Sequence, residues 1–232
     1  MILKLVYSIR FPLGGDFSLD PYFLFIKNVY ASIKKILCIN ENKKCENCIN
    51  NNKCIYYMLS GNDFDYYPSI VTNRKMIEKR RFKNNEDITL IIYMIGIAGK
   101  YDGFIQEYFN TTKYLEGQVF QKVLIEQTYI DENEYYDGNI TFKTLISSKD
   151  DVIASVQYYN NVYHTNFLIP DVDIIDNNSK IMNDYNKYFV NGHLLKYSGF
   201  KYNAKVSNYS KILFEIGTGK NAIIGGGKAC EN

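Results

Sequence analysis

The chain has 232 residues, a formal net charge of +2, 46% hydrophobic residues and 22% charged residues. These values are ordinary for a globular protein and exclude a disordered or collagen-like chain, and the length suits one large domain or two small ones. Apolar runs such as residues 88–98 are too short to cross a bilayer, and the first residues lack the apolar region and cleavage site of a secretory signal. We therefore expect a cytoplasmic protein without a membrane partner.

Strands and helices alternate in the first half of the chain. Residues 3–11 alternate apolar with polar side chains and predict a strand, which Gly14 and Gly15 end. Asp20 before Pro21 is typical of a helix N-cap with proline in the first turn, and apolar residues then recur on one helical face as far as Leu37. The later patterns predict a short helical turn at 56–59, a buried strand at 87–98, a helix at 101–115 and a strand at 120–130.

The second half of the chain is less periodic. Its patterns predict a strand at 140–146, a hairpin of 152–159 and 161–168 across Asn160, a partly helical segment at 172–189, a strand at 194–206 broken at Gly199, a short helix or turn at 208–215 and a closing strand. This order fits two split βαβ units, an α+β fold with helices on one face of each antiparallel sheet. We place the N-terminal unit at 1–130, with a cysteine insert at 38–54, and the C-terminal unit at 131–232, ending in a glycine-rich loop at 216–228.

Four of the five cysteines lie close together, at Cys38, Cys45, Cys48 and Cys54. Two residues separate Cys45 from Cys48, and two thiolates at this spacing can bind one tetrahedral ion. The surrounding segment is rich in Asn and Lys, so a bound ion would replace the core that it lacks. We predict a structural zinc ion on the four cysteines. Free thiols or a disulfide are the alternatives, and a redox Cys-x2-Cys pair is less favoured.

The glycine-rich loop has the pattern G-x-G-x5-G-x-G. Glycines without side chains let backbone N–H groups approach a ligand, and successive N–H groups can bind an anion. The pattern matches neither the phosphate loop nor the dinucleotide-binding fingerprint. The alternative is a flexible hairpin near the chain end. The residues that we predict to bind a phosphate backbone are Gly217, Gly219, Lys220, Gly225, Gly226, Gly227 and Lys228.

A second candidate basic patch lies at residues 74–83, which hold six basic residues and one acid. Lysine and arginine in such a run neutralise phosphates in a salt-dependent way. The alternative interpretation is a charged face in contact with solvent only. Tyrosine and phenylalanine are abundant, and some of them would stack on unpaired bases.

The glycine-rich loop, the segments 197–200 and 212–216 before it, and the cysteine run together resemble a known group. They are similar to the repeat-associated mysterious proteins (RAMP), the RNA-binding superfamily of CRISPR systems, and within it to precursor-crRNA-processing endoribonucleases with a four-cysteine insert. The resemblance implies tandem ferredoxin-like folds of the RNA-recognition type and binding of CRISPR repeat RNA. It also implies cleavage without a catalytic metal, in which a ribose 2′-OH attacks the adjacent phosphate and leaves a 2′,3′-cyclic phosphate.

The catalytic residue is not assigned. Members of this family often carry a histidine near the end of the first helix, where this chain has Tyr30, Lys34 and Lys35. A general base for a 2′-OH should titrate near neutral pH. The histidines are His164 and His193, of which His193 is a candidate for this base. A Lys or Tyr pair could instead stabilise the developing charge, and Lys34 is the candidate for that role.

Two other functions therefore stand beside the nuclease. A related but non-catalytic RAMP subunit would cap the 5′ handle of crRNA in an effector complex, with other CRISPR subunits as partners. A zinc-stabilised interaction module without an RNA role is the third.

Overall fold

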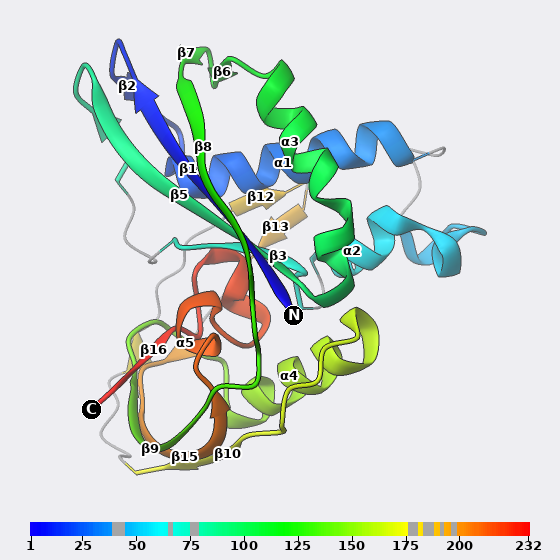
Figure 1. Cartoon of the computed structure of the whole chain (residues 1–232), viewed down its shortest axis with the longest axis vertical. Helices are drawn as coiled ribbons and strands as arrows, with labels where there is room; N and C mark the ends of the chain where they lie inside the picture. The colour runs from blue at the N-terminus through cyan, green and yellow to red at the C-terminus, as the bar shows by residue number, and fades with distance from the viewer. Residues whose placement is uncertain are drawn as a thin grey trace.

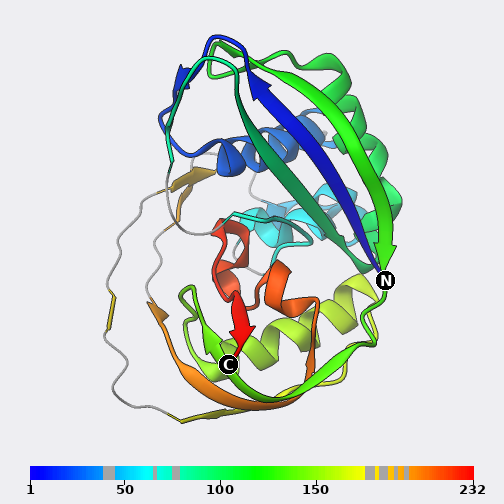
Figure 2. The ribbon, with the colours of Figure 1, turned by 60° about the vertical axis from the view of Figure 1, so that its left-hand side comes forward.

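The computed structural model describes residues 1–38, 45–64, 67–74, 79–175, 181–182, 188–190, 193–195 and 199–232. Among these residues, two four-stranded antiparallel sheets organise the chain, one in its first half and one in its second. Figures 1 and 2 show the two sheets one above the other along the long axis, with helices packed on each.

The first sheet has the strand order β3-β5-β1-β8, and the second has the order β10-β15-β9-β16. In both sheets the order along the chain is therefore second, third, first, fourth. The strands of the first sheet are β1 (Ile2–Phe11), β3 (Ile70–Thr72), β5 (Glu86–Ile95) and β8 (Gln121–Ile130). Those of the second are β9 (Tyr135–Phe142), β10 (Asp171–Ile174), β15 (Asn203–Ser210) and β16 (Ala229–Glu231).

Helices follow the first and third strands of each sheet. In the first half, α1 (Pro21–Leu37) and α3 (Asp102–Thr111) pack on the sheet, and α2 (Ile55–Phe64) lies beside α1. In the second half, α4 (Lys149–Tyr163) packs on the sheet, and the short α5 (Leu213–Ile216) follows β15. Apart from the additional helix α2, each half thus has the chain order strand, helix, strand, strand, helix, strand.

Short elements connect these helices and strands. The 3-10 helices are η1 (Cys45–Asn47), η2 (Asn51–Lys53), η3 (Gly96–Tyr101) and η4 (Lys220–Ile224). The short strands are β2 (Gly15–Asp16), β4 (Arg81–Phe82), β6 (Tyr114–Leu115), β7 (Gln118–Val119), β11 (Ile181–Met182), β12 (Tyr188–Val190), β13 (His193–Leu195) and β14 (Gly199–Phe200).

The first helix begins and ends where the sequence predicts. The Asp20 side chain accepts a hydrogen bond from the Phe23 N–H at 3.1 Å, and Pro21 occupies the first turn. The helix ends at Cys38, which has an extended backbone. The predicted strands at the N-terminus and at 120–130 are also confirmed, as β1 and β8.

The predicted hairpin across Asn160 is wrong, because residues 149–163 form α4. Val152, Val156, Tyr159 and Tyr163 are buried, and their spacing of four, three and four residues puts them on one helical face. The β-branched and aromatic content of this stretch suggests a strand, but packing on the second sheet overrides that weak preference.

The partly helical segment predicted at 172–189 is also wrong where it is described, since 172–174, 181–182 and 188–189 lie in strands. Residues 176–180 and 183–187 lie outside the described chain. Two predicted ends also differ. The strand expected as far as residue 98 ends at Ile95, and the helix expected as far as residue 115 ends at Thr111. Gly96 has a φ of +57°, and a Cβ there would collide with the Tyr163 carbonyl oxygen, so the chain turns at this glycine.

The two halves share part of their core. One buried cluster joins residues of the first sheet, such as Val71, Tyr93 and Ile95, to Val152 and Ile216 of the second half. Burial of apolar side chains is the main favourable term in folding, so this cluster holds the two sheets together. Within the described residues, no helix combines the length and the apolar character that a membrane crossing needs.

Candidate functional site

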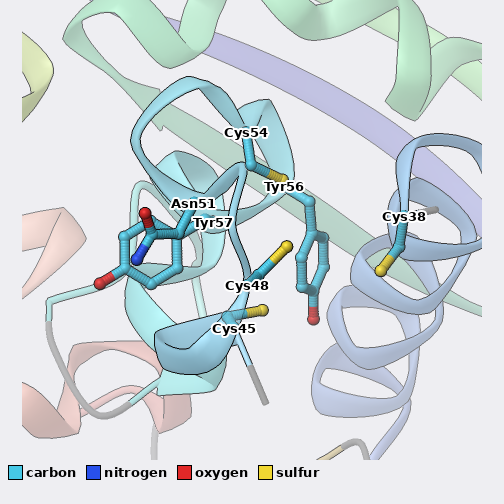
Figure 3. A pocket seen from close by; sticks show the side chains of 7 residues that line it. All are labelled: Cys38, Cys45, Cys48, Asn51, Cys54, Tyr56 and Tyr57. Carbon is cyan, nitrogen blue, oxygen red and sulfur yellow. The ribbon is translucent and has the colours of Figure 1, made fainter. Parts of the chain in front are cut away.

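The four clustered cysteines line one small cavity. Cys38 lies at the end of α1, Cys45 and Cys48 lie on one turn, and Cys54 precedes α2 (Figure 3). The Cys48 N–H donates to the Cys45 carbonyl oxygen at 3.1 Å, a turn that the two-residue spacing allows. Asn51, Tyr56 and Tyr57 complete the lining. Local hydrogen bonds and the end of α1 therefore place all four residues that the sequence nominates as metal ligands in the lining of one cavity.

The chemistry of the cavity suits one small ion. Its volume of about 20 Å³ has room for a single water-sized occupant. Four cysteines are a donor set typical of structural zinc. The cysteines are free thiols, so the structure holds no disulfide among them. The described side chains do not, however, form a group of three or more ligands close enough to bind an ion. Zinc on these cysteines stays a prediction.

The side chains at the end of α1 do not form a recognisable catalytic group among the described residues. The Tyr30 hydroxyl donates to the Leu59 carbonyl oxygen at 3.2 Å and accepts the Ile70 N–H at 3.1 Å, and burial raises its pKa. This tyrosine therefore joins α1 to α2 and β3. The Lys34 ammonium lies 5.4 Å from the centre of the Tyr56 ring, a cation–π distance.

The two histidines lie far along the chain from α1. His164 is exposed and ends α4 in a left-handed conformation, with φ 54° and ψ 44°. His193 begins β13, and its side chain lies outside the described structure. His193 thus stays a candidate for the general base.

The basic run at 74–83 divides into a buried part and an exposed part. Arg74 is 1% exposed, and its Nε lies 2.6 Å from an Asp20 carboxylate oxygen, so it serves the fold. Residues 75–78 lie outside the described chain. Lys79 and Arg81 are exposed but pair with Glu86 and Asp16. Arg80 and Lys83 are the other exposed bases of this run.

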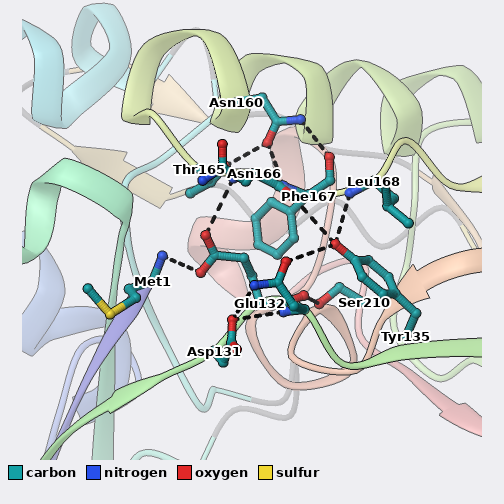
Figure 4. Close-up of polar contacts among 11 residues, drawn as sticks. Met1, Asp131, Glu132, Tyr135, Asn160, Thr165, Asn166, Phe167, Leu168 and Ser210 are labelled. Atoms are coloured by element: carbon teal, nitrogen blue, oxygen red, sulfur yellow. Dashed lines mark hydrogen bonds and ion pairs between the residues drawn. The ribbon is translucent and has the colours of Figure 1, made fainter.

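A polar cluster fixes the connection between the two sheets (Figure 4). The Glu132 side chain is 3% exposed and pairs with the α-ammonium of Met1. The Ser210 hydroxyl donates to the Glu132 carbonyl oxygen at 2.7 Å. Because a buried carboxylate needs a cation or hydrogen-bond donors, these contacts hold the start of the second sheet against the first strand.

The glycine-rich loop runs from α5 to β16 and lies between the two halves (Figure 2). The four glycines of the pattern and the additional Gly226 are buried. Positive φ angles between 69° and 87° occur at Gly217, Gly219, Gly225 and Gly227. Residues other than glycine rarely adopt such angles. A Cβ on Gly217 would collide with the Gly226 carbonyl oxygen, and one on Gly227 with that of Thr218. The close packing of the loop on itself therefore requires glycine at these positions.

Several polar groups of the loop bind the protein itself. The Gly227 N–H donates to the Leu145 carbonyl oxygen at 3.0 Å. Lys228 is 9% exposed, and its ammonium donates to the Thr72 carbonyl oxygen on β3 at 2.8 Å. The Lys228 N–H donates to the Thr144 hydroxyl at 2.7 Å. Lys228 thus links the two halves.

Lys220 differs from the other loop residues whose side chains the structure describes, because its side chain is exposed. Its backbone N–H donates to an Asp151 carboxylate oxygen at 3.1 Å. The structure brings the seven predicted RNA-binding residues into one loop, and their contact with RNA stays a prediction. Asp151, Thr72 and Thr144, which hold the loop, were missed by the sequence analysis. The only local signal was Ser148, three residues before Asp151, in an N-cap pattern.

No protein-family model matches the chain, and no curated protein matches it. Among solved structures, a Cas6 product complex is similar over 99% of both chains, with 10% sequence identity and a TM-score of 0.50. This chain has the fold of a Cas6 protein. The α+β fold with antiparallel sheets that the sequence predicts is thus confirmed, and its reading as tandem ferredoxin-like units stays a prediction.

Two further structures are similar. A Cas6-related protein from Pyrococcus furiosus has 14% identity, 99% and 97% coverage of this chain and that chain, and a TM-score of 0.48. A RAMP protein binding different RNA substrates has 12% identity, 99% and 98% coverage, and a TM-score of 0.48. At these identities the likeness concerns the fold.

Proposed function

We propose that this protein binds CRISPR repeat RNA or crRNA in the cytoplasm and processes precursor crRNA as a metal-independent endoribonuclease. The observation that carries the proposal is the Cas6 fold, in which both halves repeat one strand order. We interpret the two halves as tandem ferredoxin-like units of the RNA-recognition type, divided near residue 130. A sheet of this type binds single-stranded RNA by stacking and by backbone contacts.

The proposed reaction needs no catalytic metal. The ribose 2′-oxygen attacks the adjacent phosphorus, the 5′-oxygen of the next nucleotide leaves, and the products are a 2′,3′-cyclic phosphate and a 5′-OH. The protein must accept the 2′-OH proton and stabilise charge on the phosphate. Lys34 is our candidate for charge stabilisation, because it lies on the last turn of α1 beside Tyr56.

A second candidate function is a non-catalytic RAMP subunit that caps the 5′ handle of crRNA beside other effector subunits. One observation favours it. Tyr30, in the region where the resembled nucleases often carry a catalytic histidine, uses its hydroxyl to join α1 to Leu59 and Ile70. The fold is the same for both candidates, so the difference must be measured.

The test is incubation of the purified protein with its cognate repeat RNA in EDTA. The nuclease predicts one cut and a cyclic phosphate end, and Lys34→Ala should slow it while Lys35→Ala, on the neighbouring exposed side chain, should not. Tight binding without a cut supports the capping subunit. No binding at low salt contradicts both functions and leaves the interaction module.

We also propose that Cys38, Cys45, Cys48 and Cys54 hold a structural zinc ion. The shared cavity and the four-thiol donor set support it. The ion would tie the end of α1 to the start of α2, a segment with few apolar residues of its own. Elemental analysis should find one zinc per chain, lost in Cys48→Ser and kept in Cys230→Ser, whose thiol lies on β16. Equal zinc in both variants, or none in the wild type, would contradict the site.

A further inference from the structure

The Asp151 carboxylate lies between the glycine-rich loop and the first half of the chain. One of its oxygens accepts the Tyr67 hydroxyl at 2.9 Å, and the other accepts the Lys220 N–H at 3.1 Å. A Cβ on Gly219 would collide with that second oxygen, so Gly219 leaves the space that the carboxylate fills. The Lys220 backbone N–H therefore binds an anion that the protein itself supplies, the Asp151 carboxylate.

The carboxylate is held firmly in this place. Asp151 lies in the first turn of α4, where its N–H donates to the Ser148 hydroxyl at 3.1 Å. Asp151 is 8% exposed and Tyr67 is 7% exposed. The Tyr163 hydroxyl donates to the Tyr67 carbonyl oxygen at 2.6 Å, which fixes Tyr67 in turn. A buried carboxylate is costly without donors, and these two donors lower that cost.

We propose that Asp151 is a positioning residue for RNA binding: it fixes the Gly219–Lys220 turn so that the exposed Lys220 ammonium faces the RNA backbone. The inference rests on the proposed RNA-binding function. Lys228, the other lysine of the loop, is 9% exposed and donates to Thr72, so it serves the contact between the halves. Lys220 is left as the described lysine of this loop that can meet a phosphate.

The test is a double-mutant cycle on repeat-RNA affinity with Asp151→Ala and Lys220→Ala. Each single change should weaken binding about fivefold and lower the salt dependence, log Kd against log salt, by about 0.7 for one lost phosphate contact. Because Asp151 acts through Lys220, the double variant should bind no more weakly than either single variant. Asp151→Asn should recover most of the affinity, since the amide oxygen still accepts the Lys220 N–H and the Tyr67 hydroxyl can rotate to accept from the amide.

The matched control is Asp150→Ala, which removes the same charge from the exposed neighbour on the same turn. It should show no coupling to Lys220→Ala. If Asp151→Ala does not fold by circular dichroism, the cycle is run with Tyr67→Phe, which removes only the hydroxyl. If the losses of RNA affinity in the two single variants add up in the double variant, the positioning role is overturned, while the proposed RNA-binding function stands. Failure of the wild type to bind repeat RNA would overturn the proposed function, and the positioning role with it.

Discussion

The buried ion pair of Asp20 and Arg74 should be among the most sensitive points of the fold. The two side chains are each 1% exposed and meet at 2.6 Å, and the Arg74 guanidinium lies 5.7 Å from the centre of the Phe23 ring. Asp20 also caps α1 through the Phe23 N–H. One carboxylate thus starts the first helix and balances a charge that water cannot reach.

Two variants of Asp20 separate its role as the cap of α1 from its role as the partner of Arg74. Asp20→Asn keeps a cap oxygen but removes the charge, and loss of one partner of a buried pair costs about 3–5 kcal/mol of unfolding free energy. Asp20→Ala should lose about 1 kcal/mol more, because the cap is lost as well. The exposed pair of Asp16 and Arg81, joined at 3.0 Å, is the matched control, and Asp16→Asn should cost about 0–1 kcal/mol.

Urea unfolding followed by circular dichroism measures these differences. In thermal unfolding the Tm of Asp20→Asn should fall by about 6–20 °C. The double variant Asp20→Asn with Arg74→Met should recover much of the loss, because it removes both buried charges and fills the space with an apolar side chain. If Asp20→Asn costs no more than Asp16→Asn, the reasoning from burial is refuted.

Two further predictions concern pH and the contact between the halves. Burial raises the pKa of four tyrosines in the core, namely Tyr30, Tyr159, Tyr163 and Tyr209. Above pH 10 the unfolded chain binds fewer protons than the folded one, so the unfolding free energy should fall by about 1.4 kcal/mol per pH unit for each tyrosine; urea midpoints unchanged between pH 9 and 11 would contradict this. Lys228→Met should lower the unfolding free energy by about 1–3 kcal/mol in urea, because the Thr72 carbonyl oxygen loses its donor while the apolar stem is kept, whereas Lys220→Met should change it by less than about 0.5 kcal/mol.

Local signals predict the first half of the fold well. Asp20 and Pro21 mark the start of α1, and the apolar face that follows is the one that packs on the first sheet. In α4 the same logic failed, because Val152, Val156 and Tyr159 suit a strand as well as a helix. The Ser148 cap and the acids at 150 and 151 indicate a helix start, and this signal identifies α4.

Local sequence signals likewise predict one part of the candidate site and miss another. Cysteine spacing predicts the shared cavity because a turn is local, and Cys45 and Cys48 lie on one. The glycine-rich loop could be recognised from its pattern, but its partners could not. Thr72 and Asp151 are distant in the sequence and come close only when the two halves pack together. Glycine that a ligand requires and glycine that the fold requires therefore look alike in a sequence.

The proposed function requires that this chain recognise CRISPR RNA. The most direct measurement is the affinity for the repeat RNA of its own genome, compared with a shuffled RNA of the same length and composition, at physiological salt. We expect tighter binding of the repeat, by at least tenfold, with an affinity that falls as salt rises. Equal affinity for both RNAs would contradict it.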